Sequence, residues 1–235
     1  MIDMTMIKAA LPKQRHEIKH LVNYEDFVPL LKRLRAVMKP DAHAGLAGFY
    51  RVRSLYFDNL QDKALREKLD SVSQREKFRI RFYNEDTSYI RLEKKTKDHG
   101  LGVKRSAALS REECQRILAG DIQWLRDRED PLLVEFYGKM QFQQLKPKTI
   151  VDYLRYPFTY DLGNVRITLD TDIRTGLYSK DLFRRNLPLV SAGREFIVLE
   201  VKYDEFLPGL IQDLIQVPNR RPTAFSKYAV CRVFG

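Results

Sequence analysis

The chain has 235 residues, of which 44% are apolar and 11% aromatic, close to the composition of ordinary globular domains. This composition excludes collagen-like and disordered chains. The two cysteines, Cys114 and Cys231, are too few for a disulfide framework or a Cys-x-x-Cys metal site. Lys and Arg number 42 against 31 Asp and Glu, a net charge of +11, which indicates a polyanionic partner: nucleic acid, anionic lipid or a phosphate compound.

No targeting or membrane segment is recognisable in the sequence. Residues 1–8 are interrupted by Asp3 and Lys8 and lack the apolar core of a signal peptide. No apolar run approaches the ~20 residues of a membrane span. We therefore expect a reduced, cytoplasmic protein, and because no linker-like or low-complexity tract divides the chain, a single α+β domain over residues 1–235.

Two kinds of hydrophobic pattern alternate along the chain. Period-two alternation predicts eight strands, at residues 15–20, 50–58, 76–83, 89–96, 103–105, 149–156, 165–170 and 196–203. Periodicity of 3.6 residues, with capping residues, predicts five helices, at residues 24–38, 60–69, 111–118, 132–143 and 209–215.

Nearly every predicted strand carries one charged face. In the strand 76–83, for example, Arg79 and Arg81 lie opposite Phe78, Ile80 and Phe82. For one strand, a sheet with a solvated face explains this pattern. For the whole set, with helices to cover the apolar faces, it favours a closed, antiparallel, eight-stranded β-barrel with helices packed outside. The strand 50–58 is ambiguous, since Arg51 and Arg53 share a face that could point either way.

A closed barrel would direct the charged side chains into its lumen. The basic ones are Lys19, Arg79, Arg81, Lys95, Arg155, Arg166 and Lys202. Like charges 4 Å apart cost on the order of 4 kcal/mol at an effective dielectric near 20, so such a lumen needs an anionic ligand. An elongated polyphosphate suits it, because Arg can clamp phosphate oxygens bidentately. The acids on the same faces, Glu17, Glu93, Asp170 and Glu200, would hold a divalent cation.

Seven short motifs occur in order along the chain: Arg15-x-Glu17-x-Lys19, Phe78-Arg-Ile-Arg81, Leu92-Glu-Lys-Lys-Thr96, Tyr153-x-Arg155, Val165-Arg-Ile-Thr-Leu-Asp-Thr171, Leu199-Glu-Val-Lys202 and Ser226-Lys-Tyr228. Together they resemble the polyphosphate polymerase (VTC) domain of the vacuolar transporter chaperone complex. That domain belongs to the triphosphate tunnel metalloenzymes, with the CYTH-type triphosphatases and adenylate cyclases. The resemblance covers about residues 15 to 230.

The resemblance implies a role for each matching residue. It implies that ATP phosphates and the growing chain are bound by Lys19, Arg79, Arg81, Lys95, Arg155, Arg166 and Lys227. It adds hydroxyl contacts from Tyr153 and Ser226, and it places Lys202 beside Glu200. It further implies that Glu200, with Glu17, binds Mn²⁺ or Mg²⁺. Residues 99–104 resemble the family's Gly/Lys turn.

The implied activity is transfer of the ATP γ-phosphate to a polyphosphate chain by a metal-dependent phosphotransferase. Two alternatives stay open: a tripolyphosphatase or nucleoside triphosphatase using water in the same tunnel, and a non-catalytic polyphosphate-binding module. Arg15 replaces the first glutamate of the superfamily's Glu-x-Glu-x-Lys, which favours the polymerase branch. Nucleic acid is not expected as a partner, because no P-loop, RNP motif or basic arm is present. The eukaryotic relatives carry membrane spans that these residues lack, so a membrane partner stays open.

Overall fold

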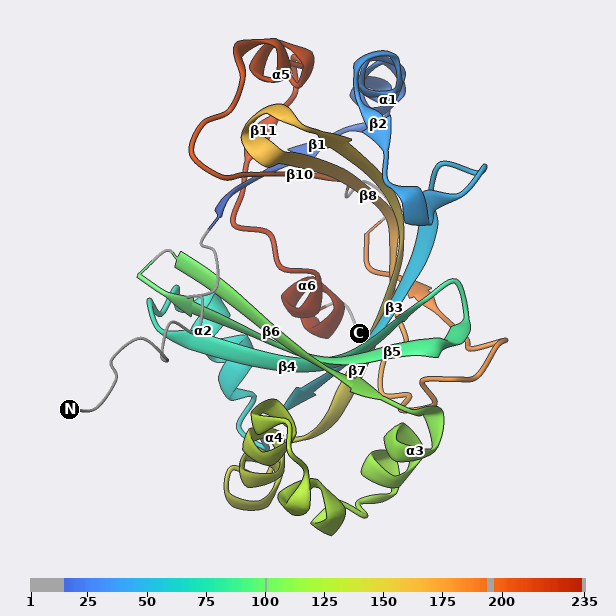
Figure 1. Ribbon diagram of the computed structural model, residues 1–235, viewed down its shortest axis with the longest axis vertical. Coiled ribbons are helices and arrows are strands. Elements are labelled where there is room, and N and C mark those ends of the chain that lie inside the picture. The colour runs from blue at the N-terminus through green and yellow to red at the C-terminus, as the bar shows by residue number, and fades with distance from the viewer. Residues whose placement is uncertain (1–14, 100, 194–196, 234–235) are drawn as a thin grey trace, which may run out of the picture.

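Figure 1 shows the computed structural model, which describes residues 15–99, 101–193 and 197–233. Three features of the sequence lie outside the described residues: the opening segment 1–8, Gly100 of the predicted Gly/Lys turn, and Phe196 at the start of the last predicted strand.

All eight predicted strands are present, and three two-residue strands join them. The longer strands are β1 (His16–Val22), β3 (Tyr50–Asp58), β4 (Arg75–Tyr83), β5 (Asp86–Asp98), β6 (Leu101–Leu109), β7 (Lys146–Tyr160), β8 (Val165–Thr175) and β10 (Ile197–Tyr203). The short ones are β2 (Lys39–Pro40), β9 (Val190–Ser191) and β11 (Arg221–Pro222).

The strands form one antiparallel sheet that curls round on itself without closing. Its order is β11-β1-β10-β8-β7-β3-β4-β5-β6, with β2 beside β7 and β9 beside β8. Within the described ranges β6 pairs with neither β1 nor β11, so the predicted closed eight-stranded barrel is wrong: the sheet has 11 strands and is open. Alternation fixes which residues share a face, but it does not determine whether the two edge strands meet. Here a side-chain ion pair between Lys95 and Glu17 spans β5 and β1 instead.

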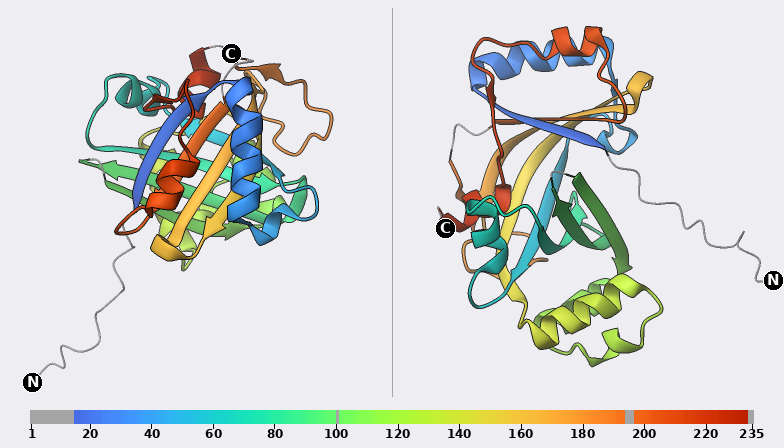
Figure 2. Two further views of the ribbon diagram at one scale, coloured as in Figure 1. Left: turned by 90° about the horizontal axis from the view of Figure 1, so that it is seen from above. Right: turned by 90° about the vertical axis from the view of Figure 1, so that its left-hand side faces the viewer.

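Helices cover the outer face of the sheet on two opposite sides (Figures 1 and 2). On one side α1 (Tyr24–Val37) and α5 (Gly209–Leu214) bury an apolar cluster that includes Leu30, Ile167 and Leu199. On the other side, α3 (Arg111–Ala119) and α4 (Pro131–Phe142) bury a second cluster that includes Phe78 and Phe136. The expectation that apolar faces pack beneath helices is confirmed, and this packing turns the charged faces inward.

The inner face is not wholly charged. The helix α6 (Lys227–Val233), which the sequence pattern did not predict, lies inside the curve of the sheet (Figure 1). Its Tyr228 and Cys231 join inward-facing residues such as Val52 and Val151 in a third apolar cluster. The ring of Tyr228 stacks on Tyr56, and its hydroxyl donates to Asp58 over 2.7 Å. This packing holds the start of α6, and with it Lys227, against the inner face.

The remaining elements are short. α2 (Lys63–Leu69) packs beside β3 and β4, and three 3₁₀ turns complete the chain: η1 (Ala42–Ala44), η2 (Gln123–Asp127) and η3 (Leu162–Asn164). The five predicted helices correspond to α1 through α5, with ends shifted by a few residues. No helix in the described ranges is long and apolar enough to cross a membrane.

The best-defined helix start is that of α3, which has a complete capping box. The Ser110 hydroxyl accepts from the Glu113 amide over 3.1 Å, and the Glu113 carboxylate accepts from the Ser110 amide over 2.8 Å. At its other end Gly120 adopts φ +85°, which glycine tolerates without strain. Replacing Ser110 with Ala is expected to lower the free energy of unfolding by about 1 kcal/mol, measured by urea denaturation. An unchanged value would show that the cap does not stabilise the fold.

Candidate functional site

The register of β3, β4 and β7 determines which side chains face inward. On β4 the Arg79 guanidinium donates to the Tyr56 hydroxyl over 2.7 Å. The Arg81 guanidinium donates to Ser54 over 3.0 Å and to the Tyr153 hydroxyl over 3.2 Å. Tyr56 and Ser54 lie on β3, so the even-numbered residues of that strand face the interior of the curve.

Arg51 and Arg53, whose direction the sequence left open, therefore lie on the outer face. Both contact Asp152, with Nε to carboxylate distances of 2.7 and 2.8 Å. Arg53 is buried and also donates to the carbonyl oxygen of Arg184 over 2.8 Å. Arg53 thus holds a connecting segment against the sheet, and neither arginine is part of the inner face.

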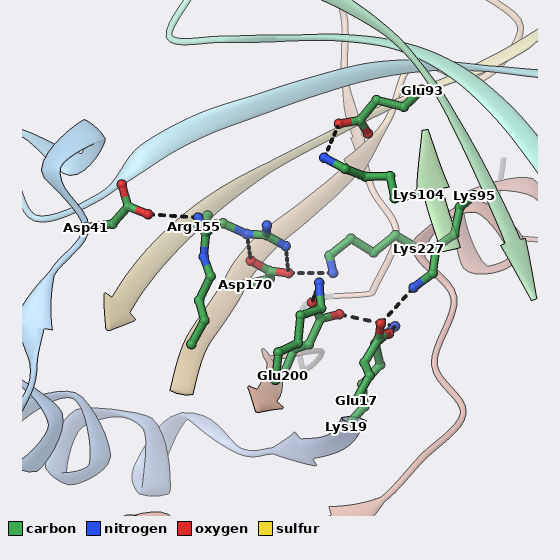
Figure 3. Close-up of polar contacts among 12 residues, drawn as sticks. Glu17, Lys19, Asp41, Glu93, Lys95, Lys104, Arg155, Asp170, Glu200 and Lys227 are labelled. Atoms are coloured by element: carbon green, nitrogen blue, oxygen red, sulfur yellow. Dashed lines mark hydrogen bonds and ion pairs between the residues drawn. The ribbon is translucent and has the colours of Figure 1, made fainter. Parts of the chain in front are cut away.

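Charged side chains from seven strands, from the turn before η1 and from α6 meet on the inner face, and Figure 3 shows most of them. We call this set the inner charged cluster. Its nine cations are Lys19, Arg79, Arg81, Lys95, Lys104, Arg155, Arg166, Lys202 and Lys227, and its five carboxylates are Glu17, Asp41, Glu93, Asp170 and Glu200. The predicted lumen cations are all present, and each already contacts a carboxylate. The cluster keeps an excess of positive charge, because cations outnumber carboxylates.

Glu93 is the anion at the centre of the β4–β6 side. It contacts Arg79 over 2.6 Å, Lys104 over 3.1 Å and Arg81 over 3.6 Å, and it is only 3% exposed. Burial raises the pKa of its carboxyl, but the surrounding guanidinium and ammonium groups outweigh burial and hold that pKa far below its ordinary value. Glu93 is therefore ionised, and it fixes the two arginines in place.

Asp170 is the buried carboxylate that contacts the cations of β7 and α6. Arg155 contacts both of its oxygens, over 2.7 and 2.8 Å, and the Lys227 ammonium contacts it over 2.6 Å. The Lys227 ammonium also lies 4.8 Å from the centre of the Tyr153 ring. Asp170 is fully buried, so these two cations are its whole charge compensation among the described residues. The hydroxyl of Ser226, which is predicted to contact phosphate, accepts a hydrogen bond from the Ala229 amide over 3.4 Å at the start of α6.

Two carboxylates meet on β1 and β10. The Lys19 ammonium contacts Glu17 over 2.9 Å and Glu200 over 3.2 Å. Lys95 contacts Glu17, and Lys202 contacts Glu200, each over 2.8 Å. Burial and the neighbouring Glu200 raise the pKa of Glu17, but the three lysines outweigh them and lower it to about 2.

Arg166 lies at one end of the cluster. It contacts Asp41 over 2.9 Å and the Tyr50 hydroxyl over 3.2 Å. Asp41 comes from the turn before η1, outside any strand, so the alternation pattern gave no signal for it. Tyr50, Ser54 and Tyr56 were also missed, although their spacings of four and two residues in the ambiguous strand placed three hydroxyls on one face.

Glu17 and Glu200 fit the metal site that the resemblance implies. In the described ranges no group of three or more His, Cys, Asp or Glu side chains could hold a metal ion. Two carboxylates that already share one cation can, however, supply two oxygen ligands. Mg²⁺ is commonly bound in this way, with one or two carboxylates completed by substrate phosphates and water. The donor set therefore suits a cation that arrives with phosphate.

Acid is expected to destabilise the fold through these carboxylates. The folded-state pKa of Glu17 is lowered from 4.5 to about 2, so its stabilising contribution is present above pH 4.5 and is lost as the pH falls toward 2. Urea denaturation should therefore give a free energy of unfolding that falls over this range. The fall should be shallower in Glu17→Gln, and equal slopes in the two proteins would contradict this assignment.

Comparison with known proteins agrees with the motifs. The family model of the VTC domain matches residues 14–234. The chain belongs to the VTC domain family. No curated protein sequence matches this VTC domain.

Solved structures resemble this VTC domain at low identity. One is a Hippeastrum protein named as an adenylyl cyclase with a dominant triphosphatase activity. The alignment covers 94% of this chain and 95% of the Hippeastrum chain, with a TM-score of 0.56 and 15% sequence identity. Another is a Bacillus halodurans protein named as an adenylate cyclase. The alignment covers 81% of this chain and 80% of the Bacillus chain, with a TM-score of 0.49 and 18% sequence identity. The likeness to the Hippeastrum protein shows that this VTC domain shares the fold of that protein.

Proposed function

We propose that this VTC domain is a polyphosphate polymerase, which transfers the γ-phosphate of ATP to the end of a polyphosphate chain. The observation that carries the proposal is the inner charged cluster of a VTC domain, where nine cations face five carboxylates. A phosphate chain has about one negative charge per unit, and fixed arginines and lysines suit its oxygens. The carboxylates hold these cations in place.

The reaction needs positioning and charge neutralisation more than covalent chemistry by the protein. A terminal oxygen of the chain attacks the γ-phosphorus of ATP and forms a new phosphoanhydride bond. The bond from the γ-phosphorus to the bridging oxygen breaks, and its electron pair leaves with ADP. No water is consumed, so each ADP released corresponds to one phosphate added.

The cluster suggests which residues perform which part. Arg79, Arg81 and Arg166 would stabilise the transferred phosphoryl oxygens, and Lys227 of α6 would bind the same group. Lys19, Lys95, Arg155 and Lys202 would bind the remaining phosphates of ATP and chain, with hydroxyl contacts from Tyr153 and Ser226. These side chains act by neutralising charge as it shifts during transfer.

Glu17 and Glu200 would hold the divalent cation, Mn²⁺ or Mg²⁺. When bound, such an ion neutralises phosphoryl oxygens. Lys19 contacts both carboxylates, so its ammonium would lie beside the ion that they hold and would bind a phosphate oxygen there.

Product analysis tests the proposal. Purified protein would be incubated with ATP and Mn²⁺, and the products run on a polyphosphate gel while ADP and free phosphate are quantified. A ladder with ADP but little free phosphate, absent in Glu200→Ala and Lys227→Ala, is expected. Absence of any ladder from the wild-type protein would overturn the proposal.

The second candidate is a triphosphatase on the same cluster. The Hippeastrum neighbour with its triphosphatase activity favours this alternative. Replacing the acceptor chain by water requires no change in the cluster. The product analysis separates the two activities, because hydrolysis gives free phosphate and no ladder.

We further propose that the partner is ATP or a polyphosphate in the cytoplasm, with or without a membrane partner, and not a nucleic acid. Phe78 and Phe82 are buried in the outer core beneath the helices, so they cannot stack on bases beside Arg79 and Arg81. Tripolyphosphate should therefore displace DNA in a competition assay. Stronger binding of DNA would contradict this part of the proposal.

A further inference from the structure

A row of cations continues beyond the inner charged cluster along β4 and β5. In the pairing of β4 with β5, three inward-facing pairs follow one another: Arg79 with Glu93, Lys77 with Lys95, and Arg75 with Lys97. Residues two apart on a strand point to the same face, so all three pairs line the inner face. The first pair is of opposite charge, and the next two pairs are of like charge.

The helix α2 brings one more cation to this row. Charge repulsion from Arg75, Lys19 and Lys97, together with burial, lowers the pKa of Lys68. Burial and the Arg75 guanidinium likewise lower the pKa of Lys97. Contacts between α2 and β4, together with the pairing of Arg75 with Lys97 across β4 and β5, bring Lys68 near these two cations. We call Lys68, Arg75, Lys77 and Lys97 the distal basic row.

The distal basic row contains no anion of its own, and Glu17 of the cluster acts on Lys97 without contacting it. All four side chains are half-buried, and none of them contacts a carboxylate among the residues that the structure describes. Within the described ranges, the contact given by the Arg75 guanidinium is a hydrogen bond to the uncharged Val72 carbonyl oxygen. Like charges directly opposite each other destabilise a sheet, so this arrangement costs folding free energy in the apo protein.

The row is continuous with the cluster through Lys95. That side chain contacts Glu17 within the cluster and faces Lys77 of the row. A strand advances by about 3.3 Å per residue, so Arg75 lies about 13 Å along β4 from Arg79. A ligand that reaches both ends must be an extended polyanion and not a single phosphate group.

We propose that the distal basic row is a second phosphate subsite, which binds the distal part of a polyphosphate chain whose reacting end lies in the inner charged cluster. This inference rests on the proposed function, and it adds a preference for long chains over triphosphate. Because the row is separate from the carboxylates of the cluster, its removal affects chain binding and not the binding of a short phosphate.

The test compares two ligands in the absence of ATP. Calorimetry would give the dissociation constants of tripolyphosphate and of a long-chain polyphosphate for the wild type and for Arg75→Ala/Lys97→Ala. Lys32→Ala/Arg35→Ala on the exposed outer side of α1 is the charge-matched control. The row variant should bind the long chain at least tenfold more weakly and tripolyphosphate within twofold of wild type, whereas the control should match wild type for both ligands.

Two further readouts strengthen the comparison. Loss of two phosphate contacts should reduce the slope of log affinity against log salt by about 1 to 2 for the long chain. The melting temperature of the free row variant should not fall, because the substitution removes like-charge repulsion. Arg75→Gln/Lys97→Gln provides a second variant with longer side chains, in case the alanine protein folds poorly.

The outcomes separate this inference from the proposed function. Unchanged long-chain binding in the row variant, or an equal loss for both ligands, would overturn the second subsite. A selective loss of long-chain binding in a protein that makes no polymer would support the subsite and count against the polymerase. Failure of the wild type to bind either ligand would overturn both.

Discussion

Replacing Lys227 with methionine is expected to lower kcat/KM for chain growth by about 10² to 10³-fold, the range found when one preorganised donor to a reacting oxyanion is removed. The ammonium faces the interior, 2.6 Å from Asp170 and 4.8 Å from the centre of the Tyr153 ring. Methionine keeps an apolar stem against that ring and removes the charge, while Arg155 still contacts both oxygens of Asp170. Steady-state kinetics with ATP and Mn²⁺ would measure the effect.

Arg232→Gln is the matched control for this prediction. Arg232 lies on the same helix, but it contacts Asp62 over 2.9 Å and not the inner charged cluster. It should therefore retain wild-type kcat/KM. A Lys227→Met protein with activity within a few-fold of wild type would show that α6 contributes no phosphate-binding group.

The largest effect on stability is expected from Asp170→Asn. Asp170 is fully buried and is the carboxylate that Arg155 and Lys227 share. Removing one partner of a buried ion pair costs about 3 to 5 kcal/mol, because the remaining charge is left uncompensated. Urea denaturation should show the free energy of unfolding reduced by this amount. Tripolyphosphate should restore part of it, since an anion that binds only the folded state stabilises that state.

Asp172→Asn supplies the comparison two residues away. Asp172 pairs with Arg174 over 2.6 Å, but both side chains are about 40% exposed, and such surface pairs contribute at most about 1 kcal/mol. The two variants should therefore differ by several-fold in their effect. Similar losses for both would mean that burial of Asp170 does not control its contribution.

Much of this architecture could be predicted from alternation alone. In β4 and β8 the pattern placed Arg79, Arg81 and Arg166 opposite apolar residues, and the structure puts those apolar residues beneath helices. The prediction succeeded because side-chain direction in a strand has a strict period of two. The pattern was least informative in β3, because Arg51 and Arg53 have the same two-residue spacing as Arg79 and Arg81 but face outward. Their direction depends on Asp152, a partner on another strand.

The rest depends on contacts that the local pattern does not encode. Closure of the barrel was predicted wrongly, because the alternation within a strand does not determine whether the strands at the two edges of the sheet pair with each other. The helix α6 is short and lies inside the sheet, where Tyr228 packs on Tyr56. Asp41 reaches Arg166 from a turn. The functional roles assigned to the predicted residues stay predictions, although the structure gathers them on one face.

The most direct test of the account follows the γ-phosphate itself. ATP labelled at that position would be incubated with the protein and Mn²⁺, and the label in polymer and in free phosphate would be measured against ADP. The account predicts one labelled phosphate in the chain for each ADP formed. Label that appears as free phosphate in equal amount to ADP would contradict it and identify a triphosphatase.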